Sequence, residues 1–107
     1  MIFYTNFAVP KQHAACTRGP FIFIRPQHKD DKGLLAHEME HVAQWWRTFG
    51  LHSFLYLFSK RYKLKCEVEA YKVQLLYSPY AHYKFAEFIS KNYDLNITEA
   101  QALELLK

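Results

Sequence analysis

The chain has 107 residues, of which half are hydrophobic, and a formal net charge of +4. This length predicts a single domain over residues 1–107, because a second hydrophobic core would need more chain. The longest apolar run, Phe54 to Phe58, is far too short to cross a bilayer, so no transmembrane segment is expected. Packing in the core is the expected role of this run, and contact with the surface of a membrane is the alternative.

Charge and cysteine content exclude several further classes of protein. The only dense basic run, Lys60 to Lys65, resembles a solvated helix end, so nucleic-acid binding is not expected. The residues after Met1 lack the basic segment of a secretory signal, and Cys16 and Cys66 do not form a CxxC pair. These features predict a protein of the reducing cytoplasm.

The chain changes once from strand-like to helix-like patterns. Residues 1–9 predict a strand and residues 10–19 a loop, while residues 21–25 form the clearest strand pattern. Pro20 and Pro26 flank that strand and indicate an edge position. Helices are expected at residues 32–49, 51–60, 64–77, 80–92 and 98–106. The sequence therefore predicts an α+β fold, with short N-terminal strands followed by a helical bundle.

The first expected helix contains the HExxH motif His37-Glu38-Met39-Glu40-His41. Residues in a helix are about 100° apart, so His41 lies about 40° from His37 on the same face, one turn later. Two imidazoles placed in this way can bind one metal ion from the same side. Glu38, about 100° away, stays free to act on a water molecule.

The ends and faces of this helix can also be predicted. The pair Asp30-Asp31 is expected to cap its start and Gly50 to stop it. An apolar stripe with helical spacing is expected to face the core, with the motif histidines on a separate polar edge. The stripe consists of Leu35, Met39, Val42, Trp46 and Phe49.

A catalytic zinc site usually has three protein ligands, so one more is expected from elsewhere in the chain. Glu67 and Glu69 lie in the 64–77 helix about 200° apart, so only one of them can face the metal. The small residue Ala70 beside the face of Glu67 would allow a close approach of the two helices, which favours Glu67. The remaining histidines lack such a pattern: His13 and His28 are expected in solvated loops, and the others are His52 and His82.

The motif and its surroundings resemble a known family of metallopeptidases. The resemblance is carried by the segment His37–Arg47, by Gly50, and by Glu67-Val68-Glu69-Ala70-Tyr71. These segments are similar to the HExxHxxQ and E-x-x-A motifs of the gluzincins. They are closest to the very short minigluzincins, which are often found in phage and bacterial genomes. The resemblance covers about residues 20–77.

Membership of this family would imply a zinc metallopeptidase. The resemblance places the Zn²⁺ ligands at His37, His41 and Glu67 and the general base at Glu38. It also implies that the strand at residues 21–25 lines the substrate cleft.

One position departs from the pattern of the larger gluzincins, which often carry Asp directly after E-x-x-A to orient a histidine ligand. Tyr71 stands there, so Gln44 or a backbone carbonyl is expected to take that role.

The expected activity is hydrolysis of a peptide or protein substrate, with Glu38 moving a proton from water to the leaving amine. A hydrogen-bond donor for the oxyanion is also required, and the sequence does not rank the candidates. These are Tyr56, Tyr62, Tyr71, Tyr77 and Tyr80. Two alternatives stay open: a zinc-binding interaction or assembly module with little turnover, and a small basic helical domain with a fortuitous motif.

Overall fold

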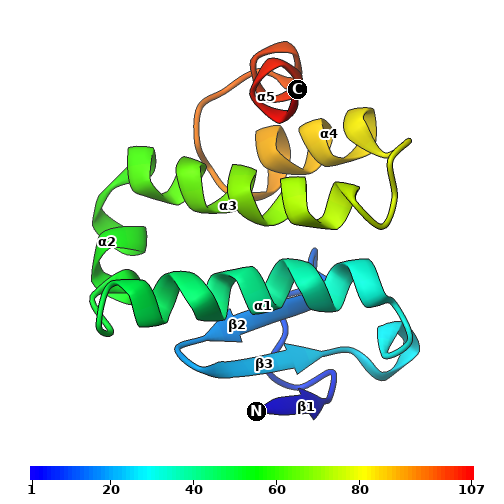
Figure 1. Ribbon diagram of the computed structural model, residues 1–107, viewed down its shortest axis with the longest axis vertical. Coiled ribbons are helices and arrows are strands. Elements are labelled where there is room, and N and C mark those ends of the chain that lie inside the picture. The colour runs from blue at the N-terminus through cyan, green and yellow to red at the C-terminus, as the bar shows by residue number, and fades with distance from the viewer.

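A computed structural model describes residues 1–107 and confirms the α+β order of short strands followed by helices. The sheet, α1, α3 and the pair α4–α5 lie in successive layers, and α2 links α1 to α3 at one end (Figure 1). The elements are β1 (Ile2–Tyr4), β2 (Ala15–Arg18), β3 (Phe21–Ile24), the 3₁₀ turn η1 (Pro26–His28), α1 (Lys32–Arg47), α2 (His52–Phe58), α3 (Lys60–Leu75), α4 (His82–Asn92) and α5 (Glu99–Leu106). No helix has the length and apolar character needed to span a bilayer.

The sheet has the order β1-β3-β2, with β3 parallel to β1 and antiparallel to β2. The predicted edge position of the strand after Pro20 is therefore wrong, because β3 is the central strand. Pro20 and Pro26 lie just outside β3, so neither removes a donor from its ladder. The edge strand β2 lies within residues 10–19, which were expected to be a loop.

Helix α1 begins as predicted, with the Asp31 side chain accepting a hydrogen bond from the backbone N–H of Leu34. The predicted apolar stripe is only partly correct: Leu35 and Val42 pack against the sheet, whereas Met39, Trp46 and Phe49 are 55%, 60% and 94% exposed. The cause is the position of α1 between two layers, because one of its faces meets the sheet and another meets α3. The residues that α1 buries are Gly33, His37, Glu38, His41 and Gln44.

Two apolar cores lie on opposite sides of the contact between α1 and α3, although the length of the chain predicts room for only one. The first belongs to the last three helices and the segments between them, and consists of Tyr71, Leu75, Phe85, Ala86, Ile89, Leu95, Ala102 and Leu106. The second lies between the sheet and α1, and consists of Ala15, Ile22 and Ile24 packed against Leu34, Leu35 and Val42. The layer between the two cores is polar. It holds the buried residues His37, Glu38, His41, Gln44, Glu67 and Gln74.

Helices α1 and α3 approach each other closely beside this polar layer. A Cβ atom added to Gly33 would lie 3.1 Å from the Cβ of Tyr77 and 3.3 Å from the Cγ of Gln74. On α3, Ala70 is fully buried, in agreement with the predicted close approach. Small residues at these positions therefore allow the polar side chains of the two helices to meet.

Candidate metal centre

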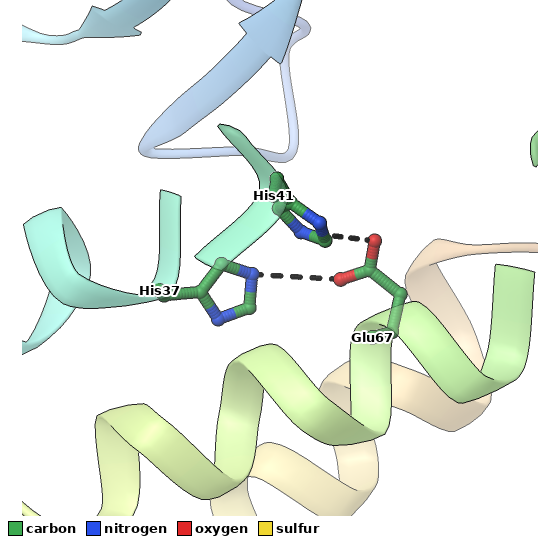
Figure 2. A group of neighbouring side chains, drawn as sticks. All are labelled: His37, His41 and Glu67. Atoms are coloured by element: carbon green, nitrogen blue, oxygen red, sulfur yellow. Dashed lines mark ion pairs between the residues drawn. The ribbon is translucent and has the colours of Figure 1, made fainter. Parts of the chain in front are cut away.

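The structure brings together the three residues that were predicted to bind a metal. His37 and His41 point from α1 towards Glu67 on α3 (Figure 2). Glu67 Oε1 lies 3.4 Å from His37 Nε2, and Glu67 Oε2 lies 3.2 Å from His41 Nε2. The exposed fractions of Glu67, His37 and His41 are only 1%, 3% and 7%. The cluster is therefore almost completely withdrawn from solvent.

The separations within the cluster fit a zinc ion. Two ligand atoms that are each about 2.1 Å from a tetrahedral zinc ion lie about 3.4 Å apart. The nitrogen–oxygen separations of 3.4 Å at His37 and 3.2 Å at His41 are close to this value but involve different oxygens of Glu67, and one ligand atom from each of the three residues lies within 4.8 Å of the others. Two imidazole nitrogens and one carboxylate oxygen are also a donor set that zinc accepts.

The hydrogen bonding of the cluster is incomplete, which also favours a bound cation. Glu67 Oε1 and His37 Nδ1 are buried and make no hydrogen bond. Buried polar atoms in folded proteins nearly always have a partner, and burial of an unpaired one is costly. A cation between the imidazoles and the carboxylate would give Glu67 Oε1 the partner that it lacks.

The charges in the cluster favour a cation at the same place. Burial acts against the charged forms of both His41 and Glu67. The attraction between the two side chains outweighs it, raising the pKa of His41 to about 10 and holding the pKa of Glu67 well below its usual range. The buried carboxylate thus requires a positive charge beside it, which a proton on His41 supplies in the metal-free protein.

Gln44 makes the orienting contact that was predicted for it. Its Oε1 accepts a hydrogen bond of 2.9 Å from His41 Nδ1, which directs His41 Nε2 towards Glu67. Its Nε2 donates to the backbone carbonyl of Cys66 and to Glu69 Oε1, both at 3.1 Å. Glu69 therefore lies outside the ligand cluster and supports Gln44 instead.

Tyr71 does not take the place of the aspartate found in larger gluzincins. Its ring packs edge-on against His37, with ring centroids 4.3 Å apart, and its hydroxyl lies 2.8 Å from that of Tyr93. Tyr71 thus fixes the plane of the His37 ring by packing, without a hydrogen bond to it.

Glu38 lies beside the candidate ligands and is held by a contact with Thr17. Its Oε2 is 3.8 Å from His37 Nε2, and its Oε1 accepts a hydrogen bond of 2.7 Å from the Thr17 hydroxyl. Sequence reasoning missed Thr17, because no local pattern in residues 10–19 marks a strand that packs against α1.

A cleft of about 460 Å³ opens next to His37, Glu38, His41 and Glu67. One wall is β2, and no residue of the 21–25 strand lines the cleft, so the cleft-lining role implied for that strand is wrong. The reason is topological, because β3 is the central strand and β2 occupies the edge beside it.

Among the five candidate tyrosines, only Tyr56 lines this cleft and also contacts a candidate ligand, by donating a hydrogen bond to Glu67 Oε2. Tyr62 contacts His52 Nδ1 through its hydroxyl at 2.8 Å, while Tyr77 and Tyr80 are exposed elsewhere. Tyr56 is therefore the candidate that geometry selects.

Histidine and cysteine side chains also border the cleft. The prediction that His13 is solvated is wrong, since it is half-buried against Tyr93 and burial lowers its pKa. His52 also lines the cleft but does not belong to the ligand cluster. Cys16 lines it too, with its thiol donating to the carbonyl of Ala8 at 3.3 Å.

Comparison with known protein families, with curated proteins and with solved structures finds no match to this chain. The chemistry of the cluster and of the cleft beside it must therefore support any functional assignment.

Proposed function

We propose that the protein is a zinc-dependent peptidase that acts on a peptide or protein substrate. His37, His41 and Glu67 would hold Zn²⁺, and Glu38 would act as the general base. The observation that carries this proposal is the buried Glu67 carboxylate between two imidazoles, with a second carboxylate beside them at the edge of a cleft. Bound zinc would polarise the substrate carbonyl and lower the pKa of a bound water towards about 7.

Glu38 is held in a position suited to proton transfer. The Thr17 hydroxyl engages Oε1, so Oε2 remains available to accept a proton and pass it to the leaving amine. The side chain is buried yet borders the cleft, where a substrate carbonyl would lie. These contacts support a base that keeps its orientation during turnover.

Tyr56 is the side chain best placed to stabilise negative charge on the substrate. Burial, followed by the nearby Glu67 carboxylate, raises its pKa above the usual value, so its hydroxyl stays protonated and can donate. Once a cation engages Glu67, the Tyr56 hydroxyl would be released to face the cleft. It could then donate a hydrogen bond to the oxyanion of a tetrahedral intermediate.

The test of this function is Glu38→Gln, which keeps the shape of the side chain and removes the base. The variant should retain its zinc and lose about 10²–10⁴-fold in cleavage rate, which is the usual contribution of a general base. The assay is cleavage of a mixed peptide library at neutral pH, read by mass spectrometry with and without a chelator.

Glu40→Gln is the matched control, because Glu40 belongs to the same motif but pairs with Arg47 at the surface. It should leave cleavage nearly unchanged. Cleavage that survives both Glu38→Gln and the chelator would contradict the proposed mechanism. Folded, zinc-loaded wild-type protein that cleaves no peptide would instead support the zinc-binding interaction or assembly module.

A further inference from the structure

Three residues of the run that was expected to pack in the core, Phe54, Leu57 and Phe58, are exposed, whereas Leu55 and Tyr56 are half-buried. Helix α2 buries none of its residues, and it links α1 to α3 at one end of the molecule (Figure 1). The surface formed by α2 and the end of α1 is strongly apolar. Its large exposed side chains are Trp46 (60%), Phe49 (94%), Leu51 (62%), Phe54 (62%), Leu57 (77%) and Phe58 (74%). A patch of neighbouring exposed apolar side chains usually marks an interaction surface.

All charged side chains in this part of the chain, residues 42–65, are basic. No Asp or Glu occurs between His41 and Cys66, whereas this segment contains Arg47, Lys60, Arg61, Lys63 and Lys65. Arg47 pairs with Glu40, but Lys60 and Arg61 are exposed and make no ion pair. The acidic pair Asp30-Asp31 lies at the opposite end of α1 (Figure 1). Apolar exposure and unpaired positive charge thus meet at a single end of the molecule.

We propose that this surface, residues 45–65, docks onto an anionic lipid bilayer. Aromatic and aliphatic side chains beside lysine and arginine are the composition that enters the interface between headgroups and acyl chains. An anionic leaflet attracts such cations, whereas a second copy would bring two positively charged surfaces together. Charge complementarity therefore selects the bilayer over self-association. This docking does not depend on peptidase activity.

The experiment is flotation of the full chain with phosphatidylcholine vesicles that contain or lack phosphatidylglycerol. Binding is expected only with the anionic lipid, and added salt should weaken it. Lys60→Gln/Arg61→Gln should weaken partitioning about thirtyfold, because each basic residue near such a surface contributes about 1 kcal/mol. Phe54→Asp/Phe58→Asp should abolish it.

Matched controls change two other basic and two other aromatic residues on other exposed surfaces. Lys72→Gln/Lys84→Gln and Tyr80→Asp/Tyr83→Asp should bind like the unmodified chain, with folding checked by circular dichroism. Equal binding to neutral and anionic vesicles would overturn the proposal. So would absence of binding by the folded chain. Concentration-dependent dimerisation that Phe54→Asp/Phe58→Asp removes, without vesicle binding, would assign the surface to a second copy.

Discussion

Glu67 and Glu69 lie close together in sequence, yet the structure gives them different roles. Glu67 places both carboxylate oxygens against the imidazoles, whereas Glu69 accepts a hydrogen bond from Gln44. Glu67→Gln should therefore reduce bound zinc well below one equivalent, while Glu69→Gln should leave it nearly intact. Elemental analysis of protein purified without chelator measures the difference. The reverse result would mean that α3 presents its other face to α1.

Gln44 should influence zinc affinity without touching the metal. Gln44→Leu keeps most of the side-chain volume but removes the acceptor that orients His41. Loss of such a supporting contact typically costs about 10–100-fold in metal affinity. Competition with a chromophoric chelator measures this loss, and Thr48→Val, near the end of the same helix, is the control. Equal affinities in the two variants would contradict the orienting role.

The candidate ligands could be predicted because their pattern is local, whereas their surroundings could not. The positions of His37, Glu38 and His41 follow from the period of one helix, and the choice of Glu67 over Glu69 follows from the small residue Ala70 beside the face of Glu67. Thr17 and His13 reach the site only after β2 and its preceding loop pack against the helices. Contacts of that kind depend on tertiary structure and leave no periodic signal in the sequence.

At the scale of elements, the approach of α1 to α3 should be sensitive to a single side chain. Gly33→Val would place atoms against Tyr77, because an added Cβ already lies 3.1 Å from the Cβ of that residue. We expect a loss of about 1–3 kcal/mol in the free energy of unfolding, as for other overpacked sites, together with weaker zinc binding. Denaturant unfolding and a zinc titration measure the two effects.

Ala43→Val is the matched control for Gly33→Val, because Ala43 is exposed on the same helix. It should lose only a fraction of a kcal/mol, roughly the difference in helix propensity. If the two variants were equally stable, α1 and α3 would not be in close contact at Gly33.

Helix positions were easier to predict than helix faces. The Asp31 cap located the start of α1, whereas α3 begins at Lys60 instead of residue 64 because the Ser59 side chain caps it. The spacing of Trp46 and Phe49 predicts a core-facing stripe only for a helix that has a single buried face. A helix between two layers buries two faces, and a polar one cannot be recognised from hydrophobic spacing.

At the scale of the whole molecule, zinc bound between α1 and α3 should stabilise the folded state. A ligand that binds only the native state at 100 times its Kd adds about 2.7 kcal/mol, which raises the melting temperature of a domain of this size by roughly 10 °C. Thermal melts with and without a strong chelator should differ by an amount of this order. The Glu67→Gln variant should melt at one temperature in both conditions. Identical midpoints of the unmodified chain, with metal loss confirmed, would contradict a site that joins the helices.

The polar layer between the two apolar cores also has a consequence for the cooperativity of unfolding. Each core has its own set of helices or strands, and the residues buried between α1 and α3 are mainly polar. Such a seam is the natural border between two cooperative units, which open at different free energies in many proteins. The candidate metal ligands lie on both sides of this border, His37 and His41 on α1 and Glu67 on α3. Occupancy of the site would therefore determine whether the 107 residues behave as one folding unit or two.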